Sequence, residues 1–171
     1  MSRISTLVSA LVVVMVASAD AQQAPAAHDL LERSIAYHDP EGLWDRARFE
    51  LEIRETGPEN RDRHTRVRID TPGNAFELLT QREGRVIEGL MADDECVLTL
   101  DGSLDFSDED RDKYRLTCDR LRWLRDYYTY LWGQPMKLRD PGTRTDPQAE
   151  ASEYQGLPVW SLRVTYDAVS Y

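Results

Sequence analysis

The sequence has few lysines and histidines, only two cysteines, and no segment that matches a common catalytic motif. It contains 21 Lys and Arg residues against 31 Asp and Glu, a formal net charge of −10, and its only lysines are Lys113 and Lys137. This excess of acidic residues argues against nucleic acid as a partner, because a protein that binds nucleic acid needs a basic surface to contact the phosphates. GxSxG, HExxH, GxGxxG and the P-loop are all missing. The sequence therefore predicts no catalytic residue, no metal site and no cofactor.

The N-terminus has the three parts of a cleavable signal peptide. Arg3 supplies positive charge, Leu7–Val16 is an apolar run, and Ala19-Asp20-Ala21 has the small-x-small pattern of a cleavage site. We expect cleavage after Ala21, so residues 1–21 form a signal peptide and the mature protein is periplasmic or secreted. The alternative is an uncleaved membrane anchor, but the run is shorter than the roughly 20 residues that span a bilayer. No second long apolar run follows, so we expect no transmembrane span after cleavage.

The two cysteines, Cys96 and Cys118, favour a disulfide in an exported chain. The bond would stabilise the fold by about 3 kcal/mol on the loop-entropy model. The alternative is a pair of buried free thiols.

Hydrophobic periodicity predicts a single α+β domain over residues 28–171, preceded by a flexible leader over 22–27. Apolar residues at helical spacing predict amphipathic helices, and period-2 alternation predicts antiparallel strands joined as a meander. The helices cover residues 28–38 and 119–132, and the strands cover 47–56, 63–71, 75–82, 85–91 and 95–100. The expected fold is a strongly curved antiparallel sheet, an incomplete barrel, with the amphipathic helices packed on its concave face.

A final hairpin is predicted from strands 148–154 and 159–166, close to the last residue, Tyr171. Its second strand alternates like one with neighbours on both sides, so an unpaired edge would favour self-association. One interpretation is that the chain is C-terminally truncated.

The apolar faces of the strands are the most informative signal for function. They can line a cavity for an apolar or lipid-like small molecule, or they can pack into the solid core of an envelope scaffold or interaction protein. A hydrolase is a third alternative, with His38 and His64 as its acid–base groups. The cavity candidates are Phe49, Leu51, Ile53, Val67, Ile69, Phe76, Leu78, Leu98, Leu100, Trp160, Leu162 and Val164.

Two further patterns are interpreted structurally. His38-Asp39 follows the first helix and is expected to end it and to anchor the next loop. Residues 101–112 place oxygen-bearing side chains at calcium-loop spacing, but Phe106 stands where that loop needs glycine. We therefore expect a solvated acidic turn that caps a helix.

Four segments together resemble a family of exported bacterial proteins of unknown function, whose architecture is similar to the LolA/LolB-type lipoprotein carriers. They are AYHDPEGLW (36–44), KYRLTCDR (113–120), YYTYLWGQPMKL (127–138) and RDPGT (139–143). The resemblance implies that Cys96 pairs with Cys118 and that further aromatic strands follow the VTYD segment. It carries no catalytic residue to this chain.

Overall fold

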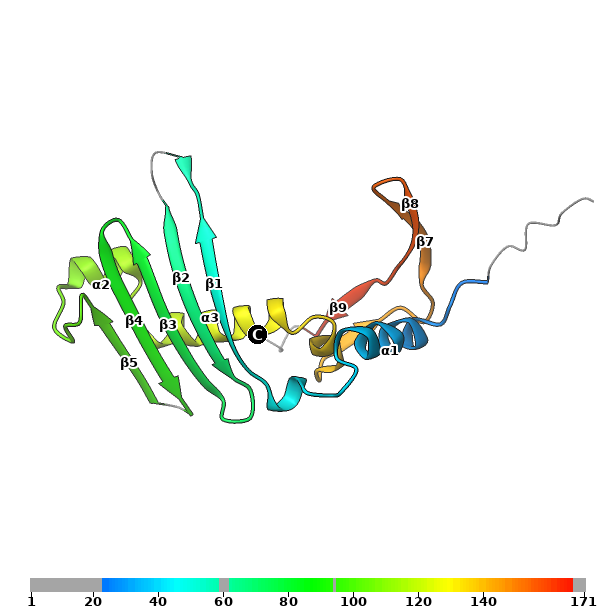
Figure 1. Ribbon diagram of the computed structural model, residues 1–171, viewed down its shortest axis with the longest axis horizontal. Coiled ribbons are helices and arrows are strands. Elements are labelled where there is room, and N and C mark those ends of the chain that lie inside the picture. The colour runs from blue at the N-terminus through cyan, green and yellow to red at the C-terminus, as the bar shows by residue number, and fades with distance from the viewer. Residues whose placement is uncertain (1–22, 59–61, 94, 168–171) are drawn as a thin grey trace, which may run out of the picture.

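Five consecutive strands form the largest sheet of the protein, as a computed structural model shows (Figure 1). The structure describes residues 23–58, 62–93 and 95–167, so the predicted signal peptide lies outside the described residues. The strands are β1 Arg48–Glu55, β2 Arg63–Asp70, β3 Ala75–Arg82, β4 Arg85–Ala92 and β5 Glu95–Leu100. Each is antiparallel to the next, in the order β1-β2-β3-β4-β5. The predicted meander and the α+β class are confirmed, and the sheet does not close into a barrel.

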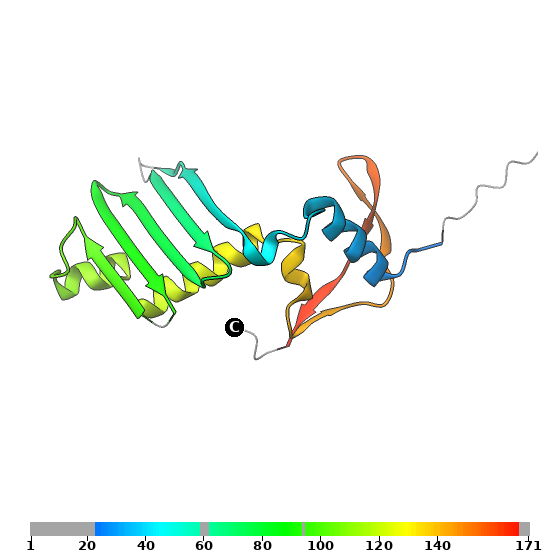
Figure 2. The same cartoon turned by 60° about the horizontal axis from the view of Figure 1, so that its bottom comes forward.

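Helix α3, Cys118–Trp132, covers one face of this sheet (Figure 2). The Thr117 side chain accepts a hydrogen bond from the Arg120 backbone N–H and caps the helix. Leu121 lies over Gly89 of β4, where a Cβ would come within 2.5 Å of its Cδ1. Glycine therefore lets the helix approach the sheet closely. A disulfide between Cys96 and Cys118, with Cα atoms 5.8 Å apart, ties the start of α3 to β5.

The hydrophobic core lies between the sheet and α3. Alternate strand residues point toward the helix, and Val67 and Phe76 are completely buried. The main cluster consists of Val67, Ile69, Phe76, Leu78, Met91, Leu121 and Tyr128. A second cluster forms where helix α2, Asp108–Tyr114, meets the end of the sheet, and it contains Ile87, Leu100, Tyr114 and Leu116. Burial of these side chains is the main favourable contribution to folding.

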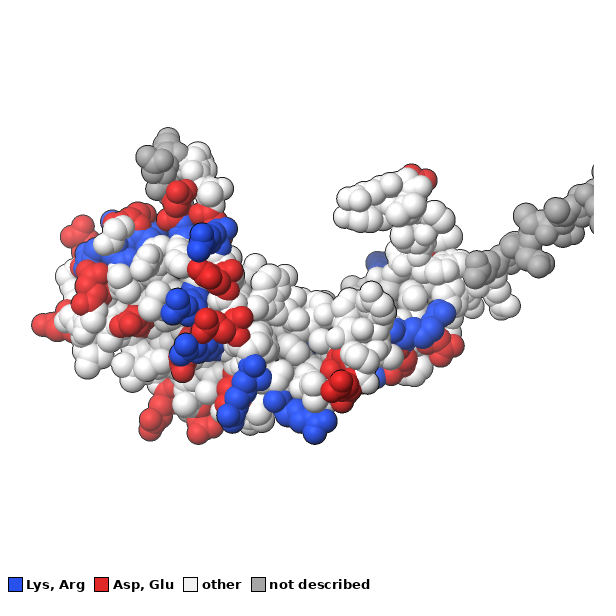
Figure 3. Space-filling model, in the orientation of Figure 1, with Lys and Arg blue, Asp and Glu red and all other residues white. Residues whose placement is uncertain are grey.

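The opposite face of the sheet carries cross-strand ion pairs (Figure 3). Arg68 lies between Glu50 and Glu77, with nitrogen–oxygen distances of 2.6 and 3.2 Å. His64 Nε2 lies 2.7 Å from Glu52 Oε1. These groups are substantially exposed, so each pair contributes little to the free energy of unfolding.

The C-terminal strands differ from the predicted hairpin. The structure has β6 Thr143–Thr145, β7 Glu150–Tyr154, β8 Leu157–Ser161 and β9 Val164–Tyr166. The predicted strand 159–166 is therefore two strands, because β8 pairs with β7 whereas β9 pairs with β6. The strand is interrupted between Ser161 and Val164, where the chain changes its pairing partner from β7 to β6. The alternation of apolar and polar residues alone does not show this interruption.

Helix α1, Ala27–His38, lies with these strands and away from the sheet (Figure 1). The Ala27 N–H donates to the Pro147 carbonyl, and the Ala149 N–H donates to the Pro25 carbonyl. Arg139 also pairs with Glu32 of the helix. Of the two helices predicted on the sheet, α3 packs there. The apolar side of α1 is buried in the C-terminal part instead, and the end of the predicted leader is hydrogen-bonded.

Candidate functional site

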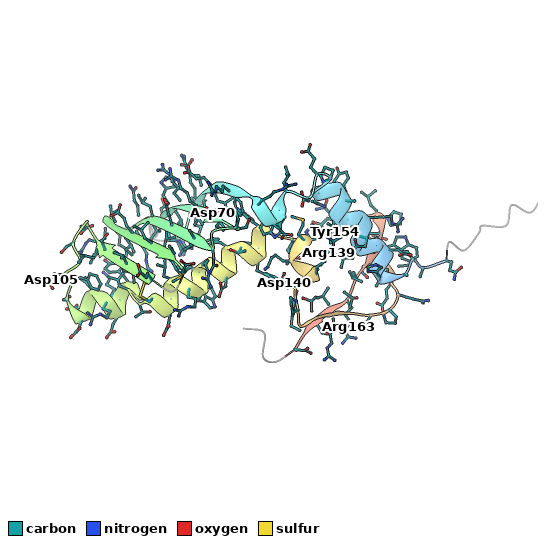
Figure 4. The ribbon with its side chains drawn as sticks, turned by 90° about the horizontal axis from the view of Figure 1, so that it is seen from below. Asp70, Asp105, Arg139, Asp140, Tyr154 and Arg163 are labelled. Carbon is teal, nitrogen blue, oxygen red and sulfur yellow. A yellow bond between two sulfur atoms is a disulfide. The ribbon has the colours of Figure 1, made fainter. Side chains whose placement is uncertain are left out.

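A hollow of about 450 Å³ lies where the sheet meets the end of α3 and the short helix η3, Met136–Arg139. Asp70, Arg139 and Asp140 mark this junction in Figure 4. Its three cations are all paired: Arg125 with Asp126, Lys137 with Asp140, and Arg139 with Glu32. The hollow therefore presents no unpaired cation to an anionic ligand.

Asp39 closes the other side of this junction. Its carboxylate accepts hydrogen bonds from the backbone N–H groups of Leu43 at 2.7 Å and Trp44 at 3.0 Å. These bonds hold the pKa of Asp39 below its usual value. The His38 ring turns elsewhere, because its Nδ1–H donates to the Ser34 carbonyl at 2.8 Å. The pair therefore ends α1 and anchors the following loop, as the sequence predicts.

A second hollow, of about 270 Å³, lies between the sheet and the segment that links α2 to α3. Its lining has 14 residues, drawn from β2, β3, β4, β5, α2, α3 and the linking segment. The apolar ones are Leu78, Ile87, Leu98, Tyr114, Leu116, Leu121 and Leu124. Thr80 adds a buried hydroxyl, which is hydrogen-bonded to Thr65 at 2.9 Å. Half of the lining residues are thus apolar, and the other half are polar or basic.

The remaining lining is strongly basic. It contains Arg63, Arg82, Lys113, Arg115 and Arg120, and it contains no acidic residue. Glu55 neutralises Arg63, and Glu83 lies 3.3 Å from Arg82 and 3.0 Å from Lys113. Within the described part of the chain, the guanidinium groups of Arg115 and Arg120 have no carboxylate within ion-pair distance.

Local structure places these two arginines. Arg115 ends α2 in the left-handed conformation, with φ of 55°. Arg120 lies in the first turn of α3, and its Cζ is 4.1 Å from the centre of the Trp123 ring, a cation–π contact. Burial, followed by the charges of Arg115 and Arg63, lowers the pKa of Arg120. The group stays protonated, because an arginine in a protein does not lose its proton.

The structure separates the predicted cavity residues into groups. Leu78 and Leu98 line the second hollow. Leu100 belongs to the smaller core cluster, and the other six residues on the sheet lie in or against the main cluster. Trp160, Leu162 and Val164 lie in the C-terminal part, where Trp160 borders a hollow with Leu30 of α1.

Sequence reasoning missed the helical side of the hollow, from Tyr114 to Leu124, and all five basic residues. The KYRLTCDR segment already placed Arg115 and Arg120 on either side of Cys118, and a disulfide to β5 would have directed them toward the sheet.

Acidic side chains of residues 101–112, the segment with calcium-loop spacing, contact other parts of the protein. Asp101 accepts a hydrogen bond from the Val86 N–H at 2.8 Å and pairs with Arg85, and Ser107 caps α2. No group of three or more potential metal ligands occurs among residues 23–58, 62–93 and 95–167. His64 lies on the exposed face of the sheet, apart from His38 on α1.

The structure is that of an α+β protein with an open sheet, one helix-covered face and a hollow of about 270 Å³ between the sheet and the α2–α3 segment. The model of a family of unknown function, DUF6503, matches residues 6–170, so the chain belongs to that family. No curated protein and no solved structure matches it. In the described ranges, no helix is both long and apolar enough to cross a membrane.

Proposed function

We propose that this protein is an exported binding or carrier module for an apolar or lipid-like small molecule, held between the sheet and the α2–α3 segment. The observation that carries this proposal is the hollow of about 270 Å³, in which six of the 14 lining residues are leucine or isoleucine. Its volume is slightly below the range for small-molecule sites, about 300–1,000 Å³. A ligand with one short chain fits this space better than a lipid with two.

Two sequence features support the same function. The signal-peptide pattern of residues 1–21 fits an exported protein, and four segments resemble proteins with the LolA/LolB-type carrier architecture. In such an arrangement, the sheet and α3 would form the two walls of the binding site, and the disulfide would hold them together at one end.

A scaffold or interaction protein with a solid core is the second candidate. It is favoured by the complete burial of Val67 and Phe76, because most of the predicted cavity residues pack against one another around them. In that case, the hollow would be a packing defect at the edge of the core.

Binding of the neutral fluorophore N-phenyl-1-naphthylamine separates these functions. We expect its fluorescence to rise with wild-type protein, and a Leu124→Trp substitution, which fills the hollow, to abolish the rise. Leu131→Trp is the matched control, because Leu131 lies on the same helix with an exposed fraction of 42%. Native mass spectrometry of protein from the periplasm would show a co-purified ligand. Absence of fluorophore binding by folded wild-type protein, or an equal loss in both variants, would contradict the proposal.

A further inference from the structure

The basic lining of the second hollow is unexpected in a protein with a net charge of −10. Of its 14 lining residues, five are basic and none is acidic. The hollow at the junction of the two parts has the opposite balance, with five carboxylates and three cations. Five of the 21 Lys and Arg residues thus line one hollow that has no acidic lining residue, although the protein as a whole is acidic.

The carboxylates near this hollow are too few to neutralise it. Glu55 pairs with Arg63, and Glu83 is shared between Arg82 and Lys113. Arg115 and Arg120 have no acidic partner among the described residues. Arg115 is exposed, whereas Arg120 is half-buried, so Arg120 loses hydration and is repelled by the charges of Arg115 and Arg63. An anion placed between them would relieve both costs.

The chemistry of the two groups indicates which anions fit. A guanidinium presents a planar fork of N–H donors that matches the oxygens of a carboxylate or a phosphate. Stacking on Trp123 restricts where the Arg120 fork can lie. Beyond the cations, the lining consists of seven apolar residues, among them Leu98 and Leu124, and two threonines. The ligand must therefore combine a charged end with an apolar end.

Resting on the function proposed above, we propose that the hollow binds a single-chain anionic amphiphile. Its carboxylate or phosphate head lies against Arg115 and Arg120, and its alkyl chain lies on Leu78, Leu98 and Leu124 between the sheet and α3. Arg63, Arg82 and Lys113 add a positive potential around the head group without replacing its two direct partners. The amphiphile enters at the α2–α3 link, where the basic side chains gather.

Calorimetric titration with four probes tests this assignment, with the ionic amphiphiles below their micelle concentrations and 1-dodecanol below its solubility limit. Dodecanoate and dodecyl phosphate should bind at least tenfold more tightly than 1-dodecanol, which has the same chain without the charge. Inorganic phosphate, the head group alone, should not bind measurably. The double substitution Arg115→Gln/Arg120→Gln should weaken dodecanoate binding at least tenfold, so that dodecanoate no longer binds more tightly than 1-dodecanol. Arg122→Gln is the control, because Arg122 lies on the same helix, is paired with Asp119, and does not line the hollow.

The outcomes distinguish this inference from the proposed function. If the neutral fluorophore binds but dodecanoate has no advantage over dodecanol, the anionic assignment is wrong and the apolar site remains. Unchanged dodecanoate binding by the folded double variant would also overturn it. Equal binding of inorganic phosphate and dodecyl phosphate would show a site for free anions instead of amphiphiles. Failure of the neutral fluorophore to bind would refute the proposed function itself.

Discussion

The contact between Leu121 and Gly89 allows a quantitative test of how α3 lies on the sheet. Leu121 has an exposed fraction of 1%, and a Cβ built on Gly89 would lie 2.5 Å from its Cδ1 and 3.0 Å from its Cδ2. Leu121→Ala removes a fully buried side chain and should lower the free energy of unfolding by about 3–5 kcal/mol. Gly89→Ala adds a methyl group to occupied space and should cost about 1–3 kcal/mol.

The double variant should be more stable than the sum of these two effects. Once the Leu121 methyl groups are gone, the new Cβ at position 89 no longer clashes and fills part of the cavity. We expect a favourable coupling energy of at least about 1 kcal/mol, which is within the range for residues in direct contact. Leu131→Ala is the control, because that side chain is 42% exposed on the same helix. Its effect should add to that of Gly89→Ala within about 0.5 kcal/mol.

Urea unfolding followed by far-ultraviolet circular dichroism measures the wild type, the three single variants and the two double variants under one set of conditions. The slopes of the free energy against urea should agree, so that the values report stability and not a change in the unfolded state. Additive effects in the Gly89 and Leu121 double variant would refute the close approach of α3 to β4.

Three further predictions concern the disulfide, the carboxylate of Asp39 and the β7–β8 hairpin. Replacing both Cys96 and Cys118 with Ser should lower the free energy of unfolding by about 3 kcal/mol, because the unfolded chain is then no longer restricted by the bond. Thiol titration of denatured, non-reduced wild-type protein is the control, and two free thiols would contradict the disulfide. Because backbone N–H groups lower the pKa of Asp39 in the folded state, its contribution to stability is complete above the unfolded value of about 4 and is lost as pH falls toward the lowered value. The urea midpoint should therefore decrease below about pH 4, and less so in Asp39→Asn, whereas an equal decrease in both proteins would show that Asp39 is not responsible. Leu157 is 65% exposed on the β7–β8 hairpin, so Leu157→Asp should reduce concentration-dependent association in sedimentation experiments, and a wild-type protein that stays monomeric at all concentrations would rule this out.

Local patterns were sufficient to predict the five-stranded meander. Each strand alternates apolar and polar residues, and each link is short and rich in turn-forming residues, so consecutive strands pair with their neighbours. The positions of α1 and α3 were equally clear along the chain. The surface against which α1 packs could not be predicted, because the apolar side of an amphipathic helix shows that this side is buried but not which element buries it.

The candidate site depends on contacts that alternation does not encode. Leu78 and Leu98 were predicted from strand patterns, whereas Arg115 and Arg120 come from the α2–α3 link. Their approach to the sheet depends on the Cys96–Cys118 bond and on the left-handed end of α2. Similarly, residues 159–166 are divided between β8 and β9 because β8 pairs with β7 whereas β9 pairs with β6. The local sequence pattern does not show this change of pairing partner.

The ion pairs on the open face of the sheet also determine how β1 and β2 can align. Phe49, Leu51 and Ile53 would still face the helix if β1 moved by two residues, so burial alone allows that shift.

The charges disfavour a shift of β1 by two residues. Moving β1 one way would place Arg54 opposite Arg66 instead of His64, and moving it the other way would place Arg48 opposite Arg68 instead of Asp70. Like charges directly across a strand pair are destabilising. Exposed pairs that add little to the stability of the folded sheet therefore select one alignment by penalising the incorrect ones.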